Sequence, residues 1–196
     1  MILPGVSSGP LYSHYRRDKK GSAVSMLSFR KTGVDSPDAQ VLLQELNDSL
    51  MAILGHNGMA HVCFDDFSQG KGFFLVGYHD DIPVCCAGIR RIDESTGEVK
   101  RVFARRNRSG YGAELMCALE ENAQEAGYDR LVLECREGNS HAIEFYKKNG
   151  YMLCGKYPPY EDEADAVCLE KSLGNADRSR ESGPAAPGEK DYIYRI

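Results

Sequence analysis

The stretch 97–135 constrains the fold of this chain more than any other part of the sequence. It contains a strand pattern, GEVKRVFA, a basic turn with glycines, RRNRSG, a helix pattern and a short apolar run, LVLEC. The helix pattern extends from about Tyr111 to Ala126, because apolar residues recur at helical spacing, at Leu115, Met116, Leu119 and Ala123. A strand, a helix and a second strand in this order predict a βαβ unit whose two strands lie parallel in one sheet.

The chain before this unit predicts one helix and an antiparallel meander. MLSFRKT, which starts at Met26, alternates apolar and polar residues like a strand. Ser36 and Pro37 are typical of a helix start, and Gly55 is placed to end that helix. The apolar positions of this helix are Val41, Leu42, Leu46, Leu50, Ile53 and Leu54. Residues 56–72 allow a loop with a short helix, and GFFLVGYH and PVCCAGIRRI then add two strands next to GEVKRVFA.

The chain after the βαβ unit predicts one more helix, over residues 140–149, and two more strands, YMLCGK and DAVCLEKSL. Residues 26–173 therefore predict a single α/β (α+β) domain, in which helices flank a mixed, mostly antiparallel sheet. Residues 1–25 are rich in Gly, Ser and basic residues and predict a flexible N-terminal extension. Residues 174–196 are rich in Pro, Gly and charged residues and predict a flexible C-terminal tail.

The composition argues against several classes of partner. The 24 basic and 29 acidic residues give a formal charge of -5, so no general positive field attracts nucleic acid or an anionic membrane. No apolar stretch approaches the ~20 residues that are needed to span a bilayer. Seven cysteines, an odd number without paired-looking spacing, indicate reduced thiols and a cytoplasmic protein. No CxxC occurs and the histidines are not at ligand spacing, so no metal site is predicted.

The basic turn between Ala104 and Tyr111 is a candidate anion site, because a helix starts directly after it. The N-terminus of a helix presents unpaired N–H groups and the positive end of the helix dipole, which suit a diphosphate. Gly110 and Gly112 let the main chain approach such a group without interference from a Cβ atom. A solvated turn can have the same residues, so this motif alone does not decide between the two interpretations.

A second motif, NSHAIEFYKKNGY, follows the strand LVLEC. On a helix, Asn139, Ala142 and Tyr146 lie three or four positions apart and share one face. Read together, the two stretches resemble the GNAT superfamily of N-acetyltransferases. The pattern NxxAxxFYxKxGY is similar to the second signature of that superfamily, and the resemblance covers roughly Met26 to Leu173.

The resemblance implies that acetyl-CoA binds at these motifs as the acyl donor, without a metal. It implies cofactor contacts from the strand residues Val102, Phe103 and Ala104, from the turn residues Asn107, Arg108, Ser109, Gly110, Tyr111, Gly112 and Ala113, and from Asn139, Ala142, Phe145 and Lys148. The turn is about two residues shorter than is typical of the family, has Asn107 where Arg or Gln is usual, and lacks the usual proline. Because backbone amides make most phosphate contacts, we expect these changes to reshape the binding of CoA and not to abolish it.

The resemblance also implies direct transfer of acetyl to a primary amine of a small molecule or to an exposed protein amine. Tyr146 is the predicted general acid, since a phenol can protonate a departing thiolate. Glu98 is the predicted general base, and Glu134 is the other strand carboxylate. The alternative is a GNAT-like module that binds acyl-CoA or a partner without turnover. The sequence leaves open the acceptor amine, the identity of the base and the oligomeric state, including a homodimer.

Overall fold

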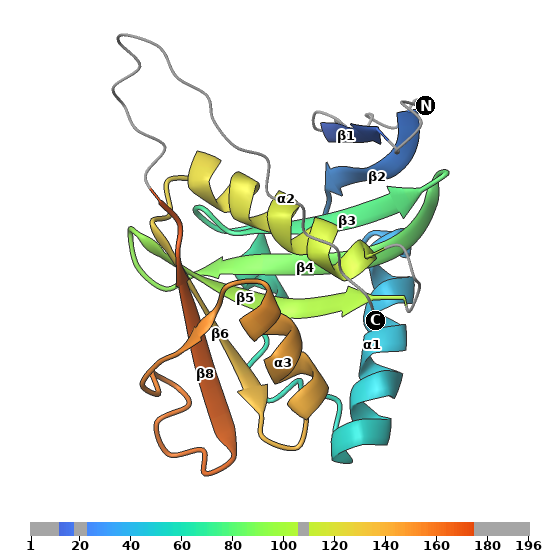
Figure 1. Cartoon of the computed structure of the whole chain (residues 1–196). Helices are drawn as coiled ribbons and strands as arrows, with labels where there is room; N and C mark the ends of the chain where they lie inside the picture. Colours follow the sequence, from blue (N-terminus) through green and yellow to red (C-terminus); the bar gives the residue numbers. More distant parts are fainter. Residues whose placement is uncertain (1–11, 18–22, 106–109, 175–196) are drawn as a thin grey trace, which may run out of the picture.

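The computed structural model describes residues 12–17, 23–105 and 110–174, with side chains from Leu27 onward in these ranges. The helices are α1 (Pro37–Leu54), the short 3-10 helix η1 (Phe64–Phe67), α2 (Tyr111–Glu125) and α3 (Ser140–Lys148). The strands are β1 (Tyr12–Arg17), β2 (Ala23–Lys31), β3 (Phe73–His79), β4 (Ile82–Arg91), β5 (Thr96–Ala104), β6 (Arg130–Arg136), β7 (Met152–Leu153) and β8 (Ala166–Ser172). Within these ranges the strands form one sheet in the order β1-β2-β3-β4-β5-β6-β8-β7 (Figure 1).

The sheet is mixed and mostly antiparallel. Neighbouring strands run antiparallel except β5 and β6, which are parallel and are connected through α2. This arrangement confirms both the βαβ unit and the meander of β3, β4 and β5. The short helix η1 lies in the loop that the sequence predicts over residues 56–72.

Strand β1 lies in residues 1–25, which the sequence predicts to be an extension outside the fold. Its backbone pairs with β2, with Tyr12 opposite Phe29 and Arg17 opposite Ala23. Strand β2 also begins earlier than the predicted start at Met26. An edge strand offers a row of unpaired N–H and C=O groups to any neighbouring segment. Backbone pairing of this kind leaves no apolar period in the sequence that would reveal it.

Helix α1 begins and ends where its capping residues predict. The Ser36 side chain accepts a hydrogen bond from the N–H of Ala39, and Gly55 adopts a left-handed conformation with φ of 77°. The buried face consists of Ala39, Leu42, Leu43 and Leu46. Two of the apolar positions of this helix, Val41 and Ile53, are 49% and 51% exposed. Val41 is on the side of α1 that faces away from the buried residues, and Ile53 lies beyond Leu46, the last of them.

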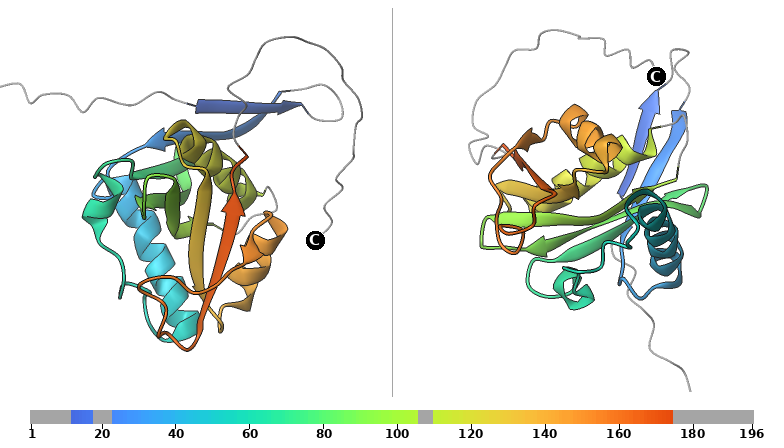
Figure 2. Two further views of the ribbon diagram at one scale, coloured as in Figure 1. Left: turned by 90° about the vertical axis from the view of Figure 1, so that its left-hand side faces the viewer. Right: turned by 90° about the horizontal axis from the view of Figure 1, so that it is seen from below.

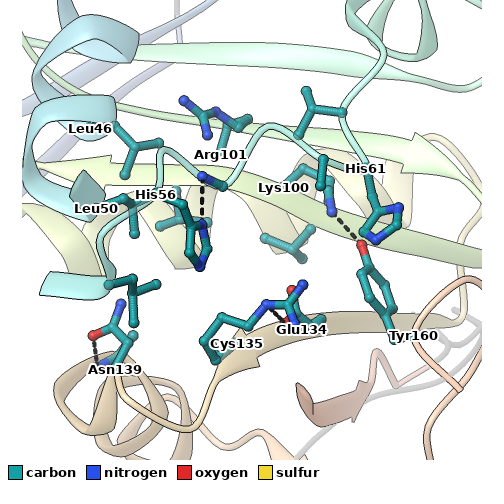
Figure 3. A pocket seen from close by; sticks show the side chains of 18 of the residues that line it. Leu46, Leu50, His56, His61, Lys100, Arg101, Glu134, Cys135, Asn139 and Tyr160 are labelled. Carbon is teal, nitrogen blue, oxygen red and sulfur yellow. Dashed lines mark hydrogen bonds and ion pairs between the residues drawn. The ribbon is translucent and has the colours of Figure 1, made fainter. Parts of the chain in front are cut away.

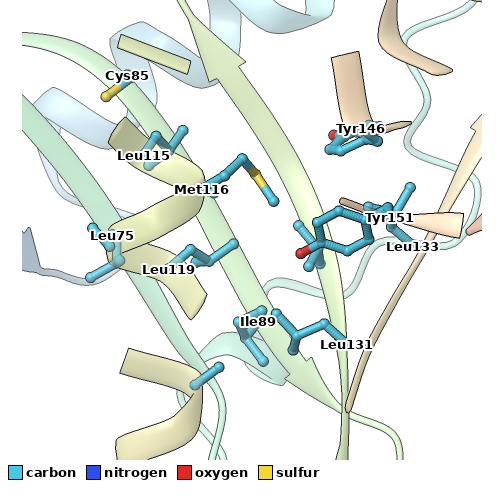
Figure 4. Close-up of a cluster of buried hydrophobic side chains, with 14 of the residues drawn as sticks. Leu75, Cys85, Ile89, Leu115, Met116, Leu119, Leu131, Leu133, Tyr146 and Tyr151 are labelled. Carbon is cyan, nitrogen blue, oxygen red and sulfur yellow. The ribbon is translucent and has the colours of Figure 1, made fainter. Parts of the chain in front are cut away.

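The helices cover both faces of the sheet (Figure 2). Helices α2 and α3 lie on one face, and α1 and η1 lie on the other. The main core is on the first face, where the predicted apolar positions of α2 pack on the sheet and on the tyrosines of the C-terminal half (Figure 4). Its members include Leu75, Ile89, Leu115, Met116, Leu119, Leu131, Leu133, Tyr146 and Tyr151. Through this core, the last third of the chain packs against the meander of β3, β4 and β5.

Strands β5 and β6 separate soon after they begin. Their parallel pairing extends only from Thr96 and Arg130 to Glu98 and Val132. Beyond that point β5 stays with β4 and β6 stays with β8. Strand β5 also carries a bulge, at which Arg101 has a φ of 56°, a left-handed value that is uncommon for a residue other than glycine. The separation opens the sheet at the carboxyl ends of both strands.

Candidate active site

Two pockets meet where β5 and β6 separate. The larger has a volume of about 880 Å³ and lies between the end of β5, α1 and the N-terminal ends of α2 and α3. The smaller has a volume of about 180 Å³ and lies between β5, β6, α1 and the loop of residues 56–62 (Figure 3). The residues that line both pockets are Leu46, Leu50, Val102, Asn139, Ala142 and Tyr146. We call them the cofactor pocket and the acceptor pocket, from the roles proposed below.

The cofactor pocket brings together most of the residues that the resemblance implies. Its lining includes Val102, Phe103, Ala104, Gly110, Tyr111, Gly112, Ala113, Asn139, Ala142 and Phe145. Lys148 is exposed near the end of α3 and does not line the cofactor pocket. Asn107, Arg108 and Ser109 lie outside the described residues. The sequence missed the ion pair of Arg105 and Glu45, in which Nη2 and Oε1 are 2.6 Å apart and both side chains line this pocket.

The start of α2 lies at the cofactor pocket and is open on its outer side. Gly110 caps the helix in a left-handed conformation with φ of 79°, and the space around its Cβ position is open. The N–H groups of Ala113 and Glu114 donate to the carbonyl oxygen of Gly110 at 3.0 and 3.2 Å, so the N–H groups of Tyr111 and Gly112 are the ones in the first turn of α2 that a ligand can use. At Gly112 a Cβ atom would lie 3.0 Å from Cε2 of Phe145, so a larger residue there would push the Phe145 ring aside by a few tenths of an ångström.

Asn139 and Tyr146 connect the two pockets. The Oδ1 atom of Asn139 caps α3 by accepting a hydrogen bond of 3.3 Å from the N–H of Ala142. The Nδ2 group of Asn139 is therefore the part of the amide that can contact a ligand. The Tyr146 ring is 9% exposed and packs against Phe145 and Tyr151. Burial raises the pKa of the Tyr146 hydroxyl, so this group holds its proton at neutral pH.

Glu98 is fully buried and does not line either pocket. Its Oε1 atom accepts hydrogen bonds from the hydroxyls of Tyr157 at 3.0 Å and Tyr160 at 2.9 Å. Arg90 donates to Oε2, and Nζ of Lys100 lies 3.5 Å from Oε1. The prediction of Glu98 as a base that contacts an amine needs correction on this point, because its oxygens are occupied by protein donors. Its position fits a residue that fixes Lys100 and Tyr160 in the wall of the acceptor pocket.

Glu134 lies in the wall of the acceptor pocket, on β6. Its side chain is 12% exposed, and its Oε1 lies 3.1 Å from Nε of Arg136. Other polar side chains of this wall are His56, His61, Lys100, Arg101, Arg136 and Tyr160. None of them belongs to a motif, so the sequence offered no signal for them beyond the positions of the loops and strands. Leu46, Leu50 and Leu54 of α1 add apolar side chains to the lining of this pocket.

The described ranges hold neither a metal-binding cluster nor a membrane-spanning helix. These ranges contain no group of three or more His, Cys, Asp or Glu side chains that is placed to hold a metal ion. No helix among them has both the length and the hydropathy that crossing a membrane requires.

Comparisons with known proteins agree with this geometry. Residues 40–151 match the family model described as the Acetyltransferase (GNAT) family. An IAA acetyltransferase from Azospirillum brasilense is 32% identical over 103 residues, which cover 51% of this chain and 67% of that protein.

Solved structures share the fold. A protein of Klebsiella pneumoniae assigned as an acyl-CoA N-acyltransferase superposes with a TM-score of 0.63 and 24% identity, over 76% of this chain and 98% of that one. A GNAT family acetyltransferase from Elizabethkingia anophelis, solved with acetyl-CoA bound, has a TM-score of 0.56 and 16% identity, over 74% and 97% of the two chains. With the match to the family model over more than half of the sequence, these results show that the chain belongs to the Acetyltransferase (GNAT) family.

Proposed function

We propose that this chain is an acetyl-CoA-dependent N-acetyltransferase, which transfers acetyl directly to a primary amine. The observation that carries this proposal is the meeting of two pockets at Asn139 and Tyr146, one next to a glycine-bearing helix start and one lined by polar side chains. Acetyl-CoA bound in the related Elizabethkingia anophelis structure supports the same cofactor here. The match of residues 40–151 to the family supports acyl transfer as the reaction class.

Each part of the cofactor pocket has a proposed role. The N–H groups at the start of α2, near Gly110 and Gly112, bind the diphosphate, together with the preceding turn of residues 107–109. Val102, Phe103 and Ala104 contact the pantetheine along β5, and Nδ2 of Asn139 donates to it from the other side. The thioester then lies where the two pockets meet, beside Tyr146.

The transfer needs no covalent enzyme intermediate. The amine nitrogen attacks the thioester carbon, so that a C–N bond forms while the C–S bond breaks. The hydroxyl of Tyr146 gives its proton to the departing thiolate and regains one from solvent. The high pKa of this hydroxyl keeps it protonated, and therefore able to act as an acid, throughout the neutral range.

The acceptor pocket favours a small amine. Its volume of about 180 Å³ is below the roughly 300–1,000 Å³ that is typical for drug-sized ligands. An exposed protein amine is the other acceptor that the reaction class allows. We also place the protein in the cytoplasm, since all seven cysteines are free thiols.

Tyr146→Phe tests the proposed acid. We expect kcat to fall about 100-fold, which is within the range for loss of one general acid. The Kd for acetyl-CoA should stay within about twofold, because the ring and its packing are retained. The measurements are the release of free thiol from acetyl-CoA over a panel of amines, and calorimetric titration with acetyl-CoA.

Tyr151→Phe is the matched control, since Tyr151 is a buried tyrosine of the same cluster that lines neither pocket. This variant should keep the wild-type kcat. Equal kcat for Tyr146→Phe and the wild type would remove Tyr146 from the mechanism. Tight binding of acetyl-CoA by the wild type without thiol release for any amine would favour the non-catalytic module.

A further inference from the structure

Cys154 and Cys168 face each other across the last two strands of the sheet. The register of β7 and β8 places Leu153 opposite Leu169. The next pair along the two segments is Cys154 and Cys168. The N–H of Cys154 donates to the carbonyl oxygen of Cys168 at 3.0 Å, which continues the antiparallel ladder past the end of β7. The two cysteines therefore form a cross-strand pair near the edge of the sheet.

The spacing of this pair suits a disulfide. Antiparallel residues that are hydrogen-bonded to each other have Cα atoms about 5.5 Å apart, and most protein disulfides connect Cα atoms that are roughly 4.4–6.8 Å apart. Residues directly opposite each other also point to the same face of a sheet. Both cysteines accordingly pack in the small cluster that contains Tyr160, and both are free thiols. A disulfide can form here without a rearrangement of the strands.

The other cysteines of the sheet lack such a partner. In the described strands, no cysteine lies opposite Cys85, Cys86 or Cys135. Cys135 follows Glu134, which is the residue of β6 that pairs with Cys168. Since side chains alternate along a strand, Cys135 points to the other face of the sheet and into the main core. The register of the strands therefore singles out Cys154 and Cys168.

The two thiols differ in exposure. Cys154 is partly exposed, whereas Cys168 is 2% exposed, so a dissolved oxidant reaches Cys154 first. Burial is the largest cause that raises the pKa of Cys154. Glu170 and Cys168 raise this pKa further, and Arg130, which is paired with Glu170, lowers it. Because the thiolate is the reactive form, oxidation should be slow at neutral pH and faster in mild alkali.

We propose that Cys154 and Cys168 form a thiol modification site, which hydrogen peroxide oxidises to an intramolecular disulfide. The thiolate of Cys154 attacks one peroxide oxygen, so that an S–O bond forms, the O–O bond breaks and hydroxide leaves. The thiolate of Cys168 then attacks the sulfur of this sulfenic acid, so that the S–S bond forms, the S–O bond breaks and a second hydroxide leaves. The two thiols give up two electrons and two protons in total, and the peroxide becomes two molecules of water. A dithiol reductant reverses the oxidation.

The disulfide would close the segment that covers the acceptor pocket. Residues 155–167 lie between the two cysteines and include Tyr160, which lines that pocket (Figure 3). The hydroxyls of Tyr157 and Tyr160 donate to the buried carboxylate of Glu98. A cross-link between the ends of this segment restricts the unfolded chain and should stabilise the cover of the pocket. Neither cysteine lines the cofactor pocket, so the binding of acetyl-CoA should not depend on the disulfide.

Treatment of the full chain with hydrogen peroxide, followed by mass spectrometry of unreduced peptides, tests this site. We expect one main intramolecular cross-link, between the peptides that contain Cys154 and Cys168, with a mass about 2 Da below that of the two thiol peptides. The cross-link should form about tenfold faster at pH 8 than at pH 7, because the thiolate fraction rises by that factor. The oxidised protein should have a Tm at least about 2 °C higher, and dithiothreitol should restore the original value. The Kd for acetyl-CoA, measured by calorimetry, should stay within about twofold.

Cys154→Ser should abolish both the cross-link and the rise in Tm. Cys168→Ala should do the same, and it keeps an apolar side chain at the buried position. Cys63→Ser is the matched control, since it removes an exposed thiol outside the sheet and should retain both effects. These measurements do not involve an amine, so this site and the proposed acetyl transfer can fail separately. A disulfide of Cys154 with any other cysteine, oxidation to sulfinic acid without a cross-link, or a rise in Tm that persists in Cys154→Ser would each overturn the proposal.

Discussion

Gly112→Asp should weaken the binding of acetyl-CoA at least about 100-fold, which corresponds to ~2.8 kcal/mol. Two effects act together. The new carboxylate stands at the positive end of α2, where it would repel the diphosphate that the N–H groups there are proposed to bind. The new Cβ would also lie 3.0 Å from Cε2 and 3.2 Å from Cζ of Phe145, so this ring, which lines the cofactor pocket, must shift. Calorimetric titration with acetyl-CoA measures the loss directly.

A pair of variants at Gly110 separates the effect of a negative charge on the binding of acetyl-CoA from the effect of an added side chain. The Cβ position of Gly110 is open, and Asn and Asp both tolerate its left-handed conformation. Gly110→Asn should therefore bind acetyl-CoA within about threefold of the wild type, whereas Gly110→Asp should bind at least about tenfold more weakly. Equal affinities for the Asn and Asp variants would show that the diphosphate does not bind at this helix start. Circular dichroism checks that each variant is folded.

Glu98→Ala should lower the free energy of unfolding by about 3–5 kcal/mol, as expected when one partner is removed from a buried ion pair. The truncation leaves the guanidinium of Arg90 and the ammonium of Lys100 without their buried carboxylate. It also leaves the hydroxyls of Tyr157 and Tyr160 without their acceptor. Urea denaturation followed by circular dichroism gives the difference in free energy.

Glu94→Ala is the control for this experiment. Glu94 is also paired, with Arg91 and Lys71, but its side chain is 76% exposed. Its loss should change the free energy of unfolding by less than about 1 kcal/mol, because exposed ion pairs contribute little. A similarly small effect for Glu98→Ala would mean that the buried network around Glu98 does not stabilise the fold.

The local elements could be predicted from the sequence because their signals are local. The bounds of α1 follow from Ser36 and Gly55, and the buried face of α2 follows from helical spacing. The exposure of Val41 follows from the same spacing, since Val41 faces away from Ala39, Leu42 and Leu43, whereas the exposure of Ile53 depends on tertiary packing at the end of α1 and could not be predicted. Strand β1 could not be predicted either. It is held by backbone pairing with β2, and this pairing leaves no pattern in the side chains of residues 12–17.

The candidate site also contains residues that could be predicted from the sequence and residues that could not. Gly110, Gly112, Asn139 and Tyr146 belong to motifs, and the structure brings them to one opening in the sheet. The burial of Glu98 could not be predicted, because its hydrogen-bond partner Tyr160 lies 62 residues later in the chain. No pattern near Glu98 reports that contact, so the sequence could not distinguish the two strand carboxylates.

The separation of β5 from β6 has a consequence for how such an enzyme changes during evolution. The cofactor pocket is framed by β5, α2 and α3, whereas the acceptor pocket is covered by the loop of residues 56–62 and by Tyr160. If the proposed function holds, substitutions in those covering loops can alter the choice of amine while the frame proposed to hold the acyl donor stays intact. Tyr160 limits this freedom, since it anchors one loop to Glu98 at the point where the strands separate. A graft of new acceptor loops onto this chain should therefore keep that tyrosine.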